Sequence, residues 1–416
     1  MLSKIARENR RNLCEKLANG LIFSAGNNYV RRNSDVDYPF RQDSNFLYLT
    51  GIEAPGYAFI LIPKTNEYLL FIPKINTHHR VWIGNIPDLA ESKKIYGADK
   101  IFYFDEYEKQ LHLLSKKFDK TFSPQSPEFL SALSELRFVK SKEELKLMKE
   151  AARISSKAHL VARKYARPGL FEYQVQAQLE KVMLEEGARL LAYPSIVGTG
   201  KNSAVLHYHA NSSKLQKGEL LLIDAGAEVH GYASDITRTF PVSGQWTTKQ
   251  KDIYDVVQNA QKKSISSVRS GVKFRDVHKI SALTILEGLT SLGLLKGRSD
   301  ELLERGVDRL FYPHGIGHAL GLDVHDVVPL PKNSESHKIK KPGSLLRLDR
   351  ALVENAVVTV EPGIYFIPAL LQDPSKRKKY QDCVQWNKVD KYLNFGGIRI
   401  EDDVIVTKAG SDVYTL

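Results

Sequence analysis

Cysteine is almost absent from this chain, which has only Cys14 and Cys383 among its 416 residues. Two cysteines cannot form a disulfide framework or a thiolate metal site, so a reducing, cytoplasmic setting is expected. Long apolar runs are missing as well, because no stretch reaches the roughly 18 apolar residues that a membrane-spanning helix needs. The first residues, MLSKIARENRRNLCEK, lack the apolar stretch of a secretory signal. The sequence therefore predicts a cytoplasmic protein without a membrane segment.

Nucleic-acid-binding motifs are also missing, although the formal net charge is +12. A basic chain raises the question because lysine and arginine attract phosphates. Here the basic residues are dispersed, and the densest groups, at 338–341 and 376–379, fall in loop-like segments. The sequence has no zinc finger, no RNP-type aromatic motif and no basic recognition helix. A solvated basic surface is expected, with no specific nucleic-acid partner.

The length of the chain and its pattern of elements predict two domains. Residues 1–125 combine helical connections with short β-type runs, as in a small α/β domain; the runs are GLIFSAG, FLYLTGI, YAFILIP, YLLFIP and KIFYFDE. The stretch TFSPQSPEFLSAL carries two prolines and several serines, so residues 126–140 are expected to connect the domains. The second domain, 141–416, opens with a helical capping box at Ser141 and Glu144. Strands and glycine turns follow from Tyr193, interrupted by a helical stretch from Thr248 to about Leu292.

Five metal-ligand candidates stand out in the second domain, because each interrupts an apolar, glycine-punctuated segment. They are Asp224, Asp235, His318, Glu361 and Glu401. A buried carboxylate is costly unless hydrogen bonds or a cation compensate its charge. For each residue alone, a hydrogen-bonded place in the core is the commoner role. Four carboxylates and an imidazole in one domain, however, indicate a cation of high charge.

Asp224 and Asp235 are expected to face each other across a hairpin that turns near His230. Cross-strand partners have Cβ atoms about 5 Å apart. Two like charges at that distance repel by roughly 3 kcal/mol at an effective dielectric of about 20, so a bridging cation is predicted. Four carboxylates exceed what one divalent ion needs, which favours two ions about 3.5–4 Å apart. An oxygen-rich site with one imidazole suits Mn²⁺, Co²⁺, Fe²⁺ or Zn²⁺.

The segments that carry these residues resemble the creatinase-like, or pita-bread, metallopeptidases, which include methionine aminopeptidase, aminopeptidase P and prolidase. The matching segments are LLLIDAGAEVHGYASDITRTFP, HGIGHALGLDVHD, TVEPGIYFI and GGIRIEDDV. DYPFRQDSNFLYLTGIEAPG also resembles the N-terminal domain of aminopeptidase P and prolidase, which methionine aminopeptidases lack. The resemblance implies an α/β (α+β) protein, with a pita-bread catalytic domain preceded by a smaller α/β domain.

The same resemblance implies a role for each metal ligand. Asp224 would hold one metal ion, Asp235 and Glu401 would bridge both, and His318 and Glu361 would complete the second. The two ions, preferably Mn²⁺, would share a hydroxide that attacks the scissile carbonyl. Glu361 would act as the general base.

Further pocket residues follow from the resemblance. His207, in VLHYHAN, matches the family's substrate-side histidine, and His325 matches the histidine that contacts the carbonyl or stabilises the tetrahedral intermediate. His314 and Tyr365 would line the pocket, and Arg399 would act behind it. Imidazole donors would receive the developing oxyanion.

The substrate is expected to be a short peptide with an Xaa-Pro bond. Arg347, in LLRLDRAL, resembles the prolidase arginine that binds the carboxylate of an Xaa-Pro dipeptide, a task suited to a guanidinium. The insertion from Ile367 to Gly397 also resembles prolidase, so an Xaa-Pro dipeptidase is predicted. The alternative is aminopeptidase P, which accepts longer peptides and which RQDSNFLYLTG resembles equally well. His209, in HYHAN, replaces the threonine of the usual aminopeptidase P pattern HYTEN.

Assembly and the remaining function classes complete the expectations. The resemblance favours a homo-oligomer, a dimer or tetramer, and Trp82 loosely matches a tryptophan that borders a neighbouring subunit's pocket in aminopeptidase P. A non-catalytic binding module is a more distant alternative, since relatives of that kind lose metal ligands. Metal-free chemistry like that of creatine amidinohydrolase is disfavoured because this chain retains all five candidate metal ligands.

Overall fold

The computed structural model describes residues 1–329 and 346–415, and contacts divide the chain into two units. The first is built mainly from Met1–Phe138, and the second contains Val139–Asp326 and residues 346–415. The segment 126–140, expected as a connection, mostly forms helix α6 (Pro127–Phe138). Among the described residues, no helix combines the length and apolarity needed to cross a bilayer.

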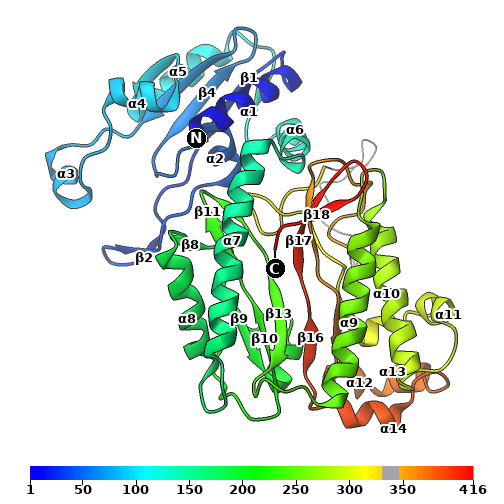
Figure 1. Cartoon of the computed structure of the whole chain (residues 1–416). Coiled ribbons are helices and arrows are strands. Elements are labelled where there is room, and N and C mark those ends of the chain that lie inside the picture. Colours follow the sequence, from blue (N-terminus) through cyan, green and yellow to red (C-terminus); the bar gives the residue numbers. More distant parts are fainter. Residues whose placement is uncertain (330–345, 416) are drawn as a thin grey trace. The chain divides into compact units, whose positions relative to one another are not determined.

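The first unit has a mixed five-stranded sheet in the order β6-β5-β4-β1-β7, of which Figure 1 labels β1 and β4. Its strands are β1 (Leu21–Ala25), β4 (Ala58–Ile62), β5 (Glu67–Ile72), β6 (Lys100–Tyr103) and β7 (Thr121–Phe122). Apolar side chains on one face, among them Leu21, Ile60 and Phe71, form a buried cluster with Tyr107 of helix α5 (Tyr107–Ser115). The α/β character expected for this part of the chain is confirmed.

One β-type prediction in this unit is wrong, because FLYLT belongs to helix α2 (Ser44–Thr50). Asp43 caps the helix by accepting a hydrogen bond from the Phe46 backbone N–H at 2.8 Å. Gly51 ends it with a left-handed φ of 68°. Phe46 to Thr50 are all buried, so the apolar run is continuous rather than periodic. Such a run does not distinguish a buried helix from a buried strand.

The second unit contains two helix pairs, each packed on strands (Figure 1). Helices α7 (Lys142–Tyr165) and α8 (Glu172–Glu185) cover β9 (Ile196–Thr199), β10 (Leu220–Asp224) and β13 (Thr237–Pro241). The capping box at Ser141 and Glu144 is present at the start of α7. The expected helical stretch from Thr248 is two helices, α9 (Thr248–Ser267) and α10 (Phe274–Ser291), separated by a turn with Gly271 at φ 88°.

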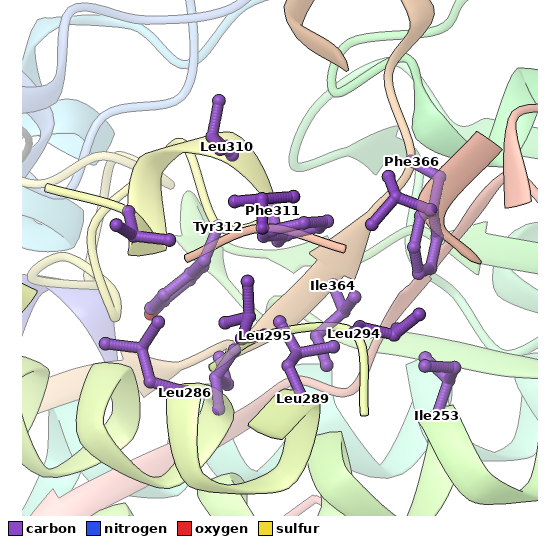
Figure 2. Close-up of a cluster of buried hydrophobic side chains, with 14 of the residues drawn as sticks. Ile253, Leu286, Leu289, Leu294, Leu295, Leu310, Phe311, Tyr312, Ile364 and Phe366 are labelled. Atoms are coloured by element: carbon purple, nitrogen blue, oxygen red, sulfur yellow. The ribbon is translucent and has the colours of Figure 1, made fainter. Parts of the chain in front are cut away.

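Helices α9 and α10 pack on β15 (Gly363–Tyr365) and β16 (Gly397–Arg399) through the cluster in Figure 2. Leu286 and Leu289 of α10 face Phe311, Tyr312 and Ile364 in this cluster. Beyond it lie β14 (Val357–Val360), β17 (Asp402–Val406) and β18 (Ser411–Val413), in the order β14-β17-β18. Both helix-and-sheet halves thus present strand ends that carry the acidic candidates.

Candidate metal centre and substrate pocket

The strands that carry Asp224 and Asp235 form a hairpin with a register different from the expected one. His230 and Gly231 make the turn, with φ values of 50° and 82°. Asp224 consequently pairs with Thr237, two residues beyond Asp235. The two aspartates are diagonal neighbours on one face of the ladder, where longer contacts still operate. The prediction that they face each other directly is wrong, because the turn lies one residue later than their midpoint.

Tyr193 joins the two aspartates and was not predicted from the sequence. Its hydroxyl lies 2.7 Å from Asp224 Oδ1 and 2.5 Å from Asp235 Oδ1. One hydroxyl proton can be donated to only one carboxylate at a time. Burial and the two aspartate charges raise the pKa of Tyr193 well above its ordinary value, so the proton is retained. The second carboxylate therefore needs a further proton or a cation.

Asp235, His318 and Glu401 lie close enough together to hold a metal ion. One ligand atom from each lies within 4.8 Å of the others, and all three residues are buried. His318 Nδ1 lies 3.0 Å from the Ala319 carbonyl oxygen, so this nitrogen carries its proton and Nε2 is directed at the carboxylates. Nε2 is 3.4 Å from Asp235 Oδ2 and 3.7 Å from Glu361 Oε1. This is the orientation that a metal-binding histidine requires.

The surroundings of Glu401 and of the neighbouring Glu361 disfavour the negatively charged form of each carboxyl group. Burial, reinforced by Asp235 and Glu361, raises the pKa of Glu401 well above its ordinary value. Burial also raises the pKa of Glu361 to about 7, although His318 and Arg399 oppose the shift. Such groups either retain protons or share a cation, because isolated buried charges are costly.

Arg399 is buried and lies near the acidic side chains of Asp224, Glu361 and Glu401. Its guanidinium donates to Asp224 Oδ2 at 2.5 Å, to Thr237 Oγ1 at 3.1 Å and to the Tyr365 hydroxyl at 3.0 Å. Burial opposes the charge of Arg399, but the neighbouring Tyr365 and acidic groups outweigh it and raise the pKa. Arg399 thus remains a cation and fixes the orientation of Asp224.

His314 is held in one neutral form. Its Nδ1 is 2.8 Å from the Gly315 carbonyl oxygen, and its Nε2 is 2.8 Å from the Tyr365 hydroxyl. Because that hydroxyl accepts from Arg399, it can donate its own proton to Nε2. Burial and the Arg399 charge lower the pKa of His314 to about 3. His314 therefore lines the pocket as an uncharged side chain in a fixed orientation.

Most of the predicted site residues line one cavity with a volume of about 520 Å³. Ten of the eleven line it: Asp224, Asp235, His318, Glu361, Glu401, His207, His314, His325, Arg347 and Arg399. Tyr365 is fully buried behind it and reaches the others through its hydroxyl. Tyr193 and His209 also line the cavity.

His325 lies on a firmly anchored segment next to His318. The two imidazoles meet edge to face, with ring centroids 4.4 Å apart. Asp326, the next residue, is buried and forms an ion pair with Lys140 at 3.0 Å. This pair holds the segment from His318 to Asp326 in place, so His325 is fixed beside the acidic cluster.

Comparison with known proteins identifies relatives of both units. Residues 146–408 match metallopeptidase family M24, and residues 6–122 match the aminopeptidase P N-terminal domain. A protein of Botryotinia fuckeliana named "Probable Xaa-Pro aminopeptidase pepP" is 35% identical over 416 residues, covering 96% of this chain and 90% of that protein. Among solved structures, Pseudomonas aeruginosa aminopeptidase PepP has a TM-score of 0.85 and 33% identity, covering 100% of this chain and 96% of that one. Aminopeptidase P of Escherichia coli with the inhibitor Pro-Leu has a TM-score of 0.86 and 31% identity, covering 100% and 95%.

These relatives correct the predicted substrate subclass. They carry the name of aminopeptidases, so the dipeptidase interpretation is not supported and its alternative fits better. The interpretation depended on Arg347 and on a loop of which residues 330–345 lie outside the described part of the chain. Arg347 is exposed at the cavity, where a guanidinium can meet a carboxylate on proline or one further along a peptide. This residue alone therefore does not separate the two subclasses.

Proposed function

The chain belongs to metallopeptidase family M24 and has an aminopeptidase P N-terminal domain, and from this premise we propose that it is an Xaa-Pro aminopeptidase. It would release the N-terminal residue from peptides whose second residue is proline. The observation that carries the proposal is the buried group of Asp235, His318 and Glu401, with Asp224 and Glu361 lining the same cavity.

We propose two divalent ions as cofactors, with Mn²⁺ the first candidate and Co²⁺, Zn²⁺ or Fe²⁺ as alternatives. Asp224 would hold one ion, His318 and Glu361 the other, and Asp235 and Glu401 both. The donor set fits, because it offers four buried or half-buried carboxylates and one imidazole oriented by a backbone carbonyl. When bound, the ions would lower the pKa of water and polarise the scissile carbonyl.

Side chains around this centre would transfer the proton and stabilise the developing negative charge. Glu361, whose carboxylate lines the same cavity, would accept a proton from the attacking water. His325 and His207 would donate hydrogen bonds to the carbonyl oxygen as it becomes negative. Burial, together with Arg347, Arg399 and His209, lowers the pKa of His207, which favours a neutral donor.

The test is hydrolysis of Ala-Pro-Gly compared with the dipeptide Ala-Pro, with Ala-Ala-Gly as the control peptide. The enzyme is first treated with a chelator and then reloaded with Mn²⁺. We expect metal-dependent release of alanine from Ala-Pro-Gly, slower hydrolysis of Ala-Pro and none of Ala-Ala-Gly. Preference for Ala-Pro would restore the dipeptidase interpretation. Metal-independent turnover, or none with any Xaa-Pro peptide, would refute the proposed chemistry.

We also propose an oligomeric state and a location for the protein. The similarity to aminopeptidase P is consistent with a homo-oligomer, which light scattering after gel filtration would measure. The scarcity of cysteine favours a cytoplasmic location, which microscopy of the tagged full-length chain would test.

A further inference from the structure

Charge is unevenly distributed along the catalytic cavity. Its carboxylates, including Asp224, Asp235 and Glu401, lie at the buried end. The exposed end carries basic side chains instead, namely His207, His209 and Arg347. A peptide whose amino terminus lies near the carboxylates would therefore extend its downstream part toward basic groups.

The loop that carries the two exposed histidines is held by a buried carboxylate. Glu172 accepts hydrogen bonds from the backbone N–H groups of Thr199 and Ser213, at 2.7 and 2.8 Å. It also accepts from Asn202 Nδ2 at 3.0 Å and from the Tyr208 hydroxyl at 2.8 Å. Both ends and the middle of the loop are thus attached to one fully buried side chain.

Tyr208 determines the direction of its neighbours. Its hydroxyl reaches inward to Glu172, while His207 and His209 on either side line the cavity. This alternation is typical of extended backbone. The two imidazoles are nearly parallel, with centroids 6.4 Å apart and an interplanar angle of 19°.

Asn211 attaches the end of the same loop to the underlying structure. Its backbone has a left-handed φ of 44°, and the residue is buried. The side chain accepts from the Val197 backbone N–H at 2.9 Å and donates to the Ser195 carbonyl oxygen at 2.8 Å. His209 is therefore presented from a fixed position, which is what a recognition residue requires.

We propose that His209 is a specificity-determining residue which, with Arg347, binds a substrate carboxylate located downstream of the proline. That carboxylate is either the C-terminus of a short peptide or an acidic side chain. The inference rests on the proposed aminopeptidase activity. The charges of Arg347 and His209 both act on His207, so the three groups share one electrostatic environment. An imidazole N–H and a guanidinium together suit a carboxylate, because hydrogen bonds to ionised acceptors are strong.

The test compares two pairs of peptides with the Mn²⁺-loaded enzyme. Ala-Pro-Gly and its C-terminal amide differ in the terminal carboxylate, whereas Ala-Pro-Asp-amide and Ala-Pro-Asn-amide differ in the side-chain carboxylate. The wild-type enzyme should prefer the acid in at least one pair. His209→Ala should reduce that preference in kcat/KM by about threefold to tenfold, the range expected for one hydrogen bond. The pair that responds identifies the source of the carboxylate.

The control is Lys201→Ala, which removes an exposed positive charge from the same loop but lines a different hollow. It should leave both preferences unchanged, and equal effects of the two variants would overturn the proposal. So would a wild-type enzyme that cleaves Ala-Pro-Gly but prefers the acid in neither pair.

Calorimetric binding of Pro-Leu and Pro-Leu-amide gives a readout that needs no turnover. His209→Ala should weaken the binding of Pro-Leu and leave that of the amide unchanged. Loss of this selectivity without any hydrolysis of Xaa-Pro peptides would support His209 while refuting the aminopeptidase activity. Equal binding by wild type and variant would overturn the inference even if the enzyme is active.

Discussion

Glu361 offers a direct test of the candidate metal centre through its effect on stability. Burial raises the pKa of this carboxyl from 4.5 to about 7 in the folded chain. At about 1.4 kcal/mol for each pH unit, the difference corresponds to about 3 kcal/mol of folding free energy. Because the side chain of Glu361 is only 17% exposed, solvent screening has little effect on this value.

The sign follows from which state binds the proton more tightly. Without metal, the folded chain keeps a proton on Glu361 at pH values where the unfolded chain has released it. The contribution to stability is therefore fully present below pH 4.5 and is lost as the pH rises through about 7. The raised pKa values of Asp235 and Glu401 act in the same direction.

The assay is denaturant unfolding of chelator-treated enzyme at several pH values between about 5 and 8. Glu361→Gln removes the titration, so the stability difference between wild type and variant should change by about 3 kcal/mol across this range. Glu354→Gln, at an exposed position in the same part of the chain, should leave the pH dependence unchanged. Parallel pH profiles for wild type and Glu361→Gln would refute the reasoning.

Metal loading should reverse the trend in wild-type enzyme. A cation competes with the protons of the cluster, so Mn²⁺ should stabilise the chain more at about pH 8 than at about pH 5.5. Calorimetric titration with Mn²⁺ in two buffers of different ionisation enthalpy should detect the released protons. Heats that do not depend on the buffer would contradict this expectation.

Two further substitutions test the supports of the site. Arg399→Leu, which removes a hydrogen-bond donor to Asp224, should weaken metal affinity by about 10-fold to 100-fold, measured as metal content against free Mn²⁺, and unchanged affinity would refute the role of Arg399. Lys140→Met breaks the buried ion pair with Asp326 and should cost about 3–5 kcal/mol, whereas Lys149→Met, in an exposed pair, should cost less than about 1 kcal/mol. Similar unfolding free energies for the two lysine variants would contradict this assignment.

The five ligand candidates could be selected from the sequence because each interrupts an apolar segment. Asp224 ends the apolar strand β10, Glu361 directly follows β14, and Glu401 directly precedes β17, and every residue of these three strands is buried. Such a position leaves few roles for a carboxylate, so the signal is local. The helix that begins after Ser141 was predictable for the same reason, since its capping box lies within four residues.

Other features depend on contacts that are distant in the chain. Tyr193 resembles any aromatic residue before a strand, and only the fold brings its hydroxyl to two aspartates. Glu172 stands at the start of a helix, where acidic residues are common. The sequence around it therefore does not indicate that it accepts hydrogen bonds from a loop up to 41 residues away. The hairpin register depended on which residues make the turn, and an error of one residue there moved the partner of Asp224 by two positions.

The ligand candidates come from both helix-and-sheet halves of the catalytic unit, Asp224 and Asp235 from one and Glu361 and Glu401 from the other. Ions held between them would act as a reversible cross-link that joins segments far apart in the sequence. Separation of the halves would then require release of the ions, so chelation should expose the chain to proteases. The degradation rate of such a protein would follow the supply of metal, independently of any peptide it cleaves.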